Sequence, residues 1–312
     1  MTDAQSSLSA PPPPDLDLRL VRYFTVVAEH RHFGRAAAEL LIAQPSLSRQ
    51  VARLEQQLGA RLLDRTPQGT RLTEAGEVFL PRAKALLRAA EQAAAATRAA
   101  AQPSRIVIGY TPGLIITPAV RQLRRQHPDA DVQTLHLEWN EARAALLDYR
   151  VDAVVTRLPL TTDGLDVTIL YDEPRLLLVS RDHRLAGKES VTLDDIADEP
   201  IPRLSDPAWN AHWRIDPRPD GRPAPDGPFV SAIEDKNELV ASGQAVAIVP
   251  AGVYKGQVRP DLTTIPLHDV PPSHVILATR AEGDTGDRSR LVAAFRRSAR
   301  ECLTGGPDET VT

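Results

Sequence analysis

The chain has 312 residues, of which 42% are hydrophobic and 25% charged, and this composition is typical of a globular protein rather than a disordered one. Its single cysteine, Cys302, excludes an intramolecular disulfide and favours a reducing compartment. The net charge is uneven: residues 15–101 hold 13 Lys and Arg against 9 Asp and Glu, whereas residues 102–312 hold 24 against 31. A modestly basic N-terminal part on an acidic body favours nucleic-acid binding by one end and argues against a uniformly basic coat protein.

The first fourteen residues, MTDAQSSLSAPPPP, lack both basic residues and an apolar core. They therefore predict a disordered tail with a polyproline run rather than a signal peptide. No apolar run elsewhere reaches about 18 residues, the length that a membrane-spanning helix needs. We expect a cytoplasmic protein that does not bind a membrane.

A capped amphipathic helix is expected after the tail, because two aspartates accompany apolar residues at helical spacing: Asp15, Asp17, Leu16, Leu20, Tyr23, Phe24 and Val27. Two further helices follow, joined by a corner at residues 42–44. One side of the earlier helix is apolar, with Phe33, Ala37, Leu40 and Leu41, and so is one stripe of the later helix, with Leu47, Val51, Leu54 and Leu58. Pro45 fits the first turn of the later helix.

The other side of this later helix is polar, with Ser46, Arg49, Gln50 and Arg53, and Gln44 lies just before it. Such side chains can contact phosphates and base edges, so the pair of helices predicts a helix-turn-helix whose second helix enters a major groove. The alternative is an ordinary amphipathic helix with a solvated face. A basic strand-turn-strand with Arg61, Arg65 and Arg71 follows directly, and it favours a DNA-binding β-wing.

The same region resembles the DNA-binding domain of LysR-type transcriptional regulators. The resemblance is carried by Leu18, Phe24, Phe33, Ala36, Ala37, the run QPSLSRQ at 44–50, Leu54, Glu55, Leu58, Gly59, Leu62, Arg65, Leu72, Thr73, Ala75 and Gly76. Gly34 and Ala43 stand where the family often has Ser or Thr, which predicts weaker helix caps. Residues and resemblance together predict DNA contacts from Arg35, Gln44, Pro45, Ser46, Ser48, Arg49, Gln50, Arg53, Arg65, Thr70 and Arg71.

A long helix is expected at residues 74–101, because Thr73 is a good N-cap and Glu74 and Glu77 suit the positive helix start. Pro81 should kink this helix or mark its first turns. The resemblance implies that it is a linker helix that pairs with a second subunit, giving a dimer or tetramer. The alternative is a helix packed on its own domain.

After a hinge at residues 102–104, strands at 105–110, 131–137 and 151–156 alternate with helices at 114–126 and 140–149. This order predicts a parallel sheet covered by helices. A second block contains strands near 165–171, 175–180, 200–203, 229–231 and 245–249, a helix at 235–242 and an exposed loop at 215–228. A strand at 274–279 and a helix at 287–303 could return to the first block. Two α/β lobes joined by two crossings resemble the periplasmic-binding-protein-like sensor domain of the same family.

The predicted organisation is therefore a tail (1–14), a winged helix-turn-helix (15–73), a linker helix (74–101), an effector-binding domain (105–305) and a second tail (306–312). Within the effector-binding domain, lobe I covers about 105–160 and 273–305, and lobe II about 161–272. The fold class is α plus α/β.

Ligands of open α/β sheets bind beyond the carboxyl ends of the strands. By resemblance, the effector contacts would be Thr111, Pro112, Trp139, Asn140, Arg157, Pro202, Arg203 and Leu204. Arg157 and Arg203 could each fork onto a carboxylate, which suggests a small organic, anionic effector. The alternative is that either arginine pairs with a neighbouring Asp or Glu. Trp209 and Trp213, four residues apart, are interpreted as packing residues rather than as a cofactor site.

Enzyme functions find little support, because the sequence has no dinucleotide-binding glycine motif, no P-loop and no nucleophile elbow, and its eight histidines lack metal-ligand spacing. No cofactor and no metal are expected. The predicted function is a LysR-type regulator that binds double-stranded DNA and responds to an effector. The alternative is a cytoplasmic solute-binding protein or enzyme without a DNA function.

Overall fold

The computed structural model describes residues 15–66, 69–102, 104–254, 258–281 and 287–303. The chain divides into two compact units, Met1–Ala94 and Ala95–Thr312. Both predicted tails lie outside the described residues, as do Pro67 and Gln68 of the wing turn and Pro103 of the hinge.

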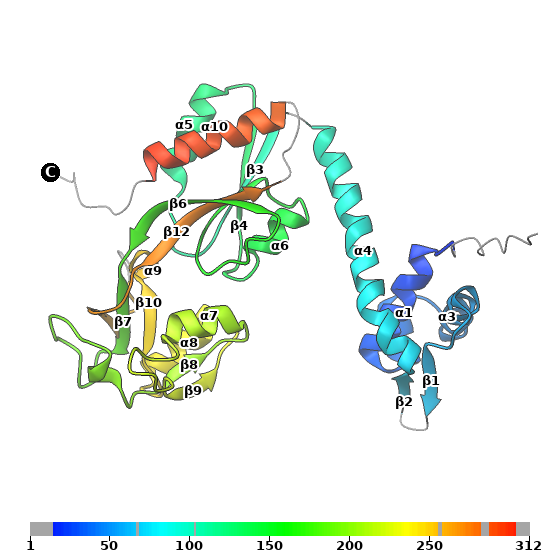
Figure 1. Ribbon diagram of the computed structural model, residues 1–312, viewed down its shortest axis with the longest axis horizontal. Coiled ribbons are helices and arrows are strands. Elements are labelled where there is room, and N and C mark those ends of the chain that lie inside the picture. The colour runs from blue at the N-terminus through cyan, green and yellow to red at the C-terminus, as the bar shows by residue number, and fades with distance from the viewer. Residues whose placement is uncertain (1–14, 67–68, 103, 255–257, 282–286, 304–312) are drawn as a thin grey trace, which may run out of the picture. The chain divides into compact units, whose positions relative to one another are not determined.

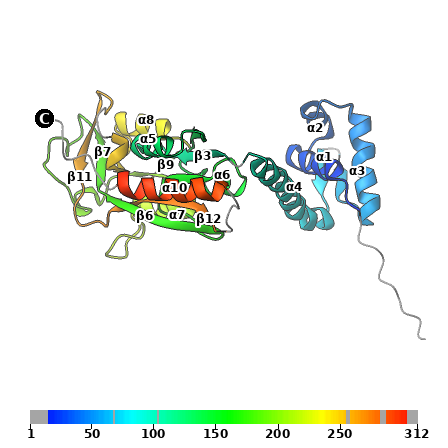
Figure 2. The same ribbon diagram turned by 90° about the horizontal axis from the view of Figure 1, so that it is seen from above.

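The first unit is a winged helix-turn-helix, as predicted. Its elements are α1 (Leu18–His30), α2 (Phe33–Glu39), α3 (Gln44–Leu58), β1 (Leu63–Thr66), β2 (Gly69–Leu72) and the start of α4 (Glu74–Ala100). The three short helices cross one another (Figure 2) around a core in which Leu20, Phe24, Leu47 and Leu54 are fully buried. Strands β1 and β2 pair antiparallel, with Arg65 opposite Thr70, and form the wing.

Helix starts in this unit differ in how they are capped. The Asp17 carboxylate accepts a hydrogen bond of 2.8 Å from the Arg19 N–H and caps α1 as expected. Ala43 gives α3 no side-chain cap, which confirms the expected weakness there. Helix α2 is capped by His32, because its Nδ1 accepts from the Gly34 N–H at 3.0 Å. The expectation of a weak start for α2 was therefore wrong.

Leu41 was expected on the buried side of the helix that is α2 in the structure, and this expectation was wrong. Helix α2 ends at Glu39, and Leu41 adopts a left-handed φ of 54° in the corner. Its side chain is 92% exposed because the reversal of the chain turns it out of the helical stripe.

Helix α4 contains Pro81 without being interrupted there. One side of this helix packs on the core of the first unit through Phe79, Leu80, Ala83 and Leu87. Val78 and Leu86 remain exposed, at 53% and 37%. The helix therefore combines packing on its own unit with an apolar surface that the described residues of this unit leave uncovered.

The second unit contains two lobes. The first lobe has a five-stranded sheet in the order β4-β3-β5-β12-β6, in which β3 is parallel to β4 and β5, and β12 is antiparallel to both of its neighbours. Helices α5 and α10 cover one face and α6 the other (Figure 1). The bounds are β3 (Arg105–Tyr110), α5 (Thr117–Gln126), β4 (Asp131–His136), α6 (Ala142–Leu147), β5 (Ala153–Arg157), β6 (Leu165–Glu173), β12 (Ser273–Arg280) and α10 (Asp287–Cys302).

The second lobe is built on a three-stranded antiparallel sheet in the order β10-β7-β11, and β8 and β9 form a separate parallel pair. Its elements are β7 (Arg175–Ser180), η1 (Asp194–Ile196), β8 (Ile201–Arg203), α7 (Pro207–Arg214), β9 (Asp226–Phe229), α8 (Ile233–Ala241), β10 (Ala247–Pro250), α9 (Ala251–Tyr254) and β11 (Leu262–Pro266). Two stretches cross between the lobes, from β6 into β7 and from β11 into β12 (Figure 1).

Several boundaries differ from the prediction. Strand β6 was assigned to the second lobe, but it pairs with β12 along residues 165–173, so the first lobe extends to Glu173. Helix α5 begins at Thr117 rather than at Leu114, and α6 is shorter at both ends than the predicted 140–149. The segment at 215–228 was expected to be an exposed loop, but Arg218 and Ala224 within it are buried. Among the described helices, none has the length and apolar character needed to cross a membrane.

Candidate nucleic-acid interface and effector cavity

The polar face of α3 points away from the core of the first unit. Because Leu47, Val51 and Leu54 fix one stripe of the helix against α1 and α2, the opposite side remains accessible. On it, Gln44, Pro45, Arg49 and Arg53 are exposed. Ser46, Ser48 and Gln50 are half-buried at its edges, and the Gln50 Oε1 is buried without a hydrogen-bond partner among the described residues. This arrangement presents two guanidinium groups and several amide and hydroxyl groups along one helix.

Residues next to α3 extend this surface. Arg35 is exposed on α2, and its guanidinium donates a hydrogen bond of 2.9 Å to the His30 carbonyl, which holds it beside the end of α1. Arg71 is exposed on β2. Arg65 lies on β1, directly opposite Thr70, but its side chain is outside the described part of the structure.

Thr70 was predicted to contact DNA, and the structure corrects this. Its side chain is only 6% exposed, and its backbone N–H donates a hydrogen bond of 2.9 Å to the Arg31 carbonyl. Thr70 therefore attaches the wing to the end of α1 and offers little surface to a partner. Side chains alternate between the two faces of a strand, so the residue after the buried Thr70, Arg71, points outward.

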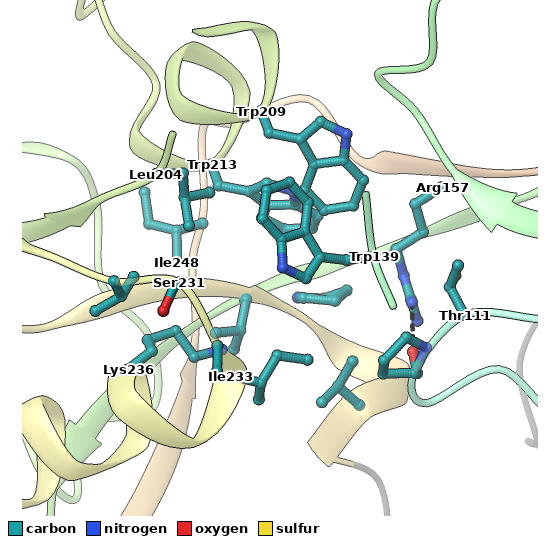
Figure 3. A pocket seen from close by; sticks show the side chains of 16 residues that line it. Thr111, Trp139, Arg157, Leu204, Trp209, Trp213, Ser231, Ile233, Lys236 and Ile248 are labelled. Atoms are coloured by element: carbon teal, nitrogen blue, oxygen red, sulfur yellow. Dashed lines mark hydrogen bonds between the residues drawn. The ribbon is translucent and has the colours of Figure 1, made fainter. Parts of the chain in front are cut away.

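A cavity of about 90 Å³ lies in the second unit between the two lobes. Figure 3 shows its walls, which are mostly apolar. The first lobe contributes Thr111, Pro112, Trp139 and Arg157; the second contributes Leu204, Trp209, Trp213, Val230, Ser231, Ala232, Ile233, Lys236, Ile248, Val249, Pro250 and Val253. The strands β3, β4 and β5 end at this cavity, as expected of a ligand site on an α/β sheet.

Five of the eight predicted effector residues line the cavity: Thr111, Pro112, Trp139, Arg157 and Leu204. The other three do not. Asn140 is exposed outside it, and Pro202 is buried within β8. Arg203 is directed elsewhere, as described below. Residues that the sequence did not assign to the site, notably Lys236 and Ile233 on α8, complete the walls.

Arg157 is paired inside the protein and is not a free anion-binding group. Its Nε and Nη2 donate to the two carboxylate oxygens of Glu173 at 2.7 and 3.2 Å, and its Nη1 donates to the Pro112 carbonyl at 2.8 Å. The side chains of Arg157 and Glu173 are only 4% and 6% exposed. The alternative of an internal ion pair is thus correct for Arg157, and it replaces the predicted carboxylate fork.

Arg203 is likewise paired within the second lobe. Its Nε donates to the Gly227 carbonyl at 3.1 Å, its Nη1 lies 3.7 Å from the Asp226 carboxylate, and its guanidinium lies 5.3 Å from the centre of the Phe229 ring. These contacts join β8 to β9. The prediction that Arg203 binds the effector is therefore wrong.

Three indole rings form one wall of the cavity. Trp139 of the first lobe lies 4.8 Å from Trp209 of the second, between ring centres, and Trp209 lies 6.1 Å from Trp213. The Trp209 Nε1 donates a hydrogen bond of 2.8 Å to the Pro159 carbonyl in the first lobe. Trp209 and Trp213 were interpreted as packing residues only, but they also line the cavity, and Trp209 connects the lobes across it.

Within the described residues, no group of three or more His, Cys, Asp or Glu side chains is arranged to hold a metal ion.

Two family models match the chain. Residues 18–77 match the bacterial regulatory helix-turn-helix protein of the lysR family, and residues 100–303 match the LysR substrate binding domain. The second match alone covers more than half of the chain. The chain belongs to the LysR family of transcriptional regulators. Its helix-turn-helix and substrate-binding domain match the fold described above, and the alternative of a solute-binding protein without a DNA function is not favoured.

Relatives of this LysR-family chain are themselves described as regulators. The uncharacterized HTH-type transcriptional regulator YnfL of Escherichia coli is 38% identical over 193 residues, covering 60% of this chain and 65%, just under two thirds, of YnfL. A probable cat1 operon transcriptional activator of Acinetobacter lwoffii is 31% identical over 310 residues, covering 94% of this chain and 98% of the activator. Both names describe a transcriptional regulator or activator.

Solved structures show the same relationship. The crystal structure of full-length CbnR complexed with its target DNA is 25% identical to this LysR-family chain, with a TM-score of 0.50, and the match covers 91% of this chain and 100% of CbnR. Full-length BenM is 26% identical with a TM-score of 0.51, covering 92% and 96%. Both neighbours are full-length proteins, so the likeness extends over the helix-turn-helix and the lobes.

Proposed function

We propose that this LysR-family regulator binds operator DNA as a homo-oligomer, and that a small organic effector in the cavity between the lobes changes its affinity for that DNA. The observation that carries the proposal is the combination, in one chain, of an outward-facing polar α3 and an apolar cavity built from both lobes. Operator binding implies a cytoplasmic location.

The proposed DNA contacts are the side chains on α3 and next to it. Exposed Arg49 and Arg53 can donate to guanine or to phosphate, and Gln44 and Gln50 can pair with adenine. Arg35 and Arg71 are exposed as well, and we assign them contacts to the phosphates of the adjacent backbone. Pro45, Ser46, Ser48 and Arg65 complete the proposed interface, and Thr70 is omitted because it is buried.

A homo-oligomer is supported by helix α4. Val78 and Leu86 are exposed on it although they are apolar, and a second copy of the same helix would bury them. Whether the assembly is a dimer or a tetramer is decided by contacts beyond one chain. Residues 74–101 are accordingly proposed as the linker helix between the DNA-binding domain at 15–73 and the effector-binding domain at 105–305.

Regulation requires that the effector bind two states of the protein with different affinity. The cavity provides for this, because its walls come from two lobes that are joined by only two crossings and by contacts such as the Trp209–Pro159 hydrogen bond. A ligand that touches Trp139 and α8 at once would favour one separation of the lobes. We therefore propose the cavity, rather than Arg203 or Asn140, as the effector site.

Replacing Arg49 by alanine tests the DNA interface. We expect Arg49→Ala to weaken binding to a duplex from upstream of the chain's own gene at least tenfold, on the order of 1–3 kcal/mol, because a base-contacting guanidinium is lost. Fluorescence anisotropy over a range of salt concentrations measures this. The matched control is Arg125→Ala, which removes the same charge from an exposed position on α5. Equal losses in both variants would refute a specific role for α3.

A further inference from the structure

We infer that the effector is a small, largely apolar monoanion whose charge is bound by Lys236 of α8, and not by Arg157. The inference rests on the proposed role of the cavity as the effector site. It follows from the charge balance of the walls, from their polarity and from the size of the space.

Among the described residues, two with cationic side chains line the cavity, Arg157 and Lys236. Arg157 is neutralised by Glu173, which accepts two hydrogen bonds from it and a third from the Gly252 N–H at 2.7 Å. Lys236 has no carboxylate within ion-pair distance among the described residues; its Nζ lies 5.3 Å from the centre of the Tyr254 ring. The cavity wall therefore has one unbalanced positive charge, at α8.

The surroundings of Lys236 make its positive charge energetically unfavourable as long as no anion is bound. Removal from water lowers the pKa of the Lys236 ammonium to about 8, and the nearby Glu234 opposes this shift only in part. The amine nevertheless remains mostly protonated near neutral pH. A bound anion would supply the missing counter-charge in an environment that water screens poorly, so the interaction should be strong.

The remaining walls select against polyhydroxylated and multiply charged ligands. The Thr111 hydroxyl is hydrogen-bonded to Thr156 at 3.2 Å, and the Ser231 hydroxyl donates to the Asp235 carboxylate at 3.3 Å. The three indoles and the aliphatic side chains of Ile233, Ile248 and Val253 supply most of the other surface. A sugar or a dianion would bury polar groups without partners here, whereas an apolar body with one charged end would not.

The size of the cavity limits the ligand further. Its volume of about 90 Å³ is smaller than that of an engineered protein cavity of ~150 Å³ that holds benzene. In Figure 3 Lys236 lies on the α8 side of this space, and Trp139 and Arg157 belong to the opposite lobe. A short carboxylate with a branched apolar end could reach Lys236 with its charge and the indoles with its body.

Tryptophan fluorescence measures binding directly, because the chain has three tryptophans and all of them line the cavity. The full chain is titrated with isobutyrate and with its neutral isostere isobutyramide, and then with propionate and propionamide. We expect a saturable change in which at least one carboxylate binds at least tenfold more tightly than its amide. Lys236→Gln should remove this preference and Lys236→Arg should retain it.

Lys188→Gln is the matched control, because Lys188 is a second-lobe lysine that is paired with Asp195 at the surface. It should leave carboxylate binding unchanged. The inference is overturned if the amides bind as tightly as the carboxylates, if Lys236→Gln leaves carboxylate affinity intact, or if neither carboxylate gives a saturable change.

Operator binding, followed by anisotropy in the same samples, separates this inference from the proposed function. If an amide binds as tightly as its carboxylate and shifts operator affinity, the cavity remains the effector site, but the inference that the effector is an anion is overturned. A carboxylate that binds through Lys236 without any effect on operator affinity would support the ligand class and overturn the regulatory role of the cavity.

Discussion

Glu173→Ala is expected to destabilise the second unit by about 3–5 kcal/mol, because it leaves the buried Arg157 guanidinium without its counter-charge. The carboxylate accepts from two nitrogens of Arg157 and from the Gly252 N–H, so three hydrogen bonds are lost together. Urea denaturation monitored by tryptophan fluorescence reports on the unfolding of this unit alone, since Trp139, Trp209 and Trp213 all lie in it.

The position of this pair explains why its loss should matter for regulation. Arg157 ends β5 and Glu173 ends β6 in the first lobe, whereas Gly252 lies in α9 of the second. A Cβ atom at Gly252 would lie only 2.3 Å from the Glu173 Oε1, so the close approach requires glycine. The pair therefore joins the two lobes beside the cavity, and breaking it should loosen their contact.

Two control variants test whether the loss of stability comes from the burial of the ion pair and from the unpaired charge that Glu173→Ala leaves. Glu238→Gln breaks the ion pair of Glu238 with Arg259, in which the Glu238 side chain is 73% exposed, and it should cost less than about 1 kcal/mol. The double variant Arg157→Met with Glu173→Leu should be more stable than Glu173→Ala, because no unpaired charge remains. A loss of under 1 kcal/mol in Glu173→Ala would contradict the account.

Gly76→Ala is expected to destabilise the first unit by about 3 kcal/mol, although alanine favours helices over glycine by roughly 1 kcal/mol. An added Cβ would lie 2.1 Å from the Leu62 carbonyl oxygen and 2.9 Å from the Leu72 side chain. That carbonyl already accepts a hydrogen bond of 3.0 Å from the Thr73 N–H, so the backbone cannot easily move away. The clash should therefore exceed the gain in helix propensity.

Helical circular dichroism during urea denaturation measures this change, since the first unit has no tryptophan. Ala89→Gly, at an exposed position of the same helix, calibrates propensity alone and should cost about 1 kcal/mol. Stabilisation by Gly76→Ala would show that α4 does not pack on Leu62 as described.

The sequence was sufficient for the first unit because its signals are local. The apolar residues Leu47, Val51 and Leu54 repeat at helical spacing, and they are buried as expected. The same periodicity could not show that the chain reverses at Leu41. The reversal requires a left-handed backbone conformation at this residue, and no glycine marks the position in the sequence. Nor did it identify His32 as the cap of α2, since histidine is not a usual capping residue.

In the second unit the sequence predicted most of the strands, but it did not predict which strands pair with one another. Strand β6 joins the first lobe only because it pairs with β12, more than a hundred residues later. Strand β11 was missed altogether, since the segment Leu262–Pro266 is short and half polar. Sheet membership depends on contacts distant in sequence, which local patterns do not contain.

The sequence predicted part of the cavity lining but not its chemistry. Thr111, Trp139 and Arg157, which were assigned from the strand ends and the family resemblance, line the cavity. The roles of the arginines were wrong because their acidic partners, Glu173 and Asp226, come from other strands. Lys236 had no distinguishing pattern around it, and only the folded structure shows that it lines the same cavity as the indoles.

Sequence-specific operator binding is tested by fluorescence anisotropy of the full chain on DNA from upstream of its own gene, compared with a scrambled duplex of the same composition. We expect binding to the upstream duplex that is at least ~10³-fold tighter than to the scrambled one and that weakens steeply as salt rises. Equal and weak binding to both duplexes, at every salt concentration, would contradict a sequence-specific regulator at this site.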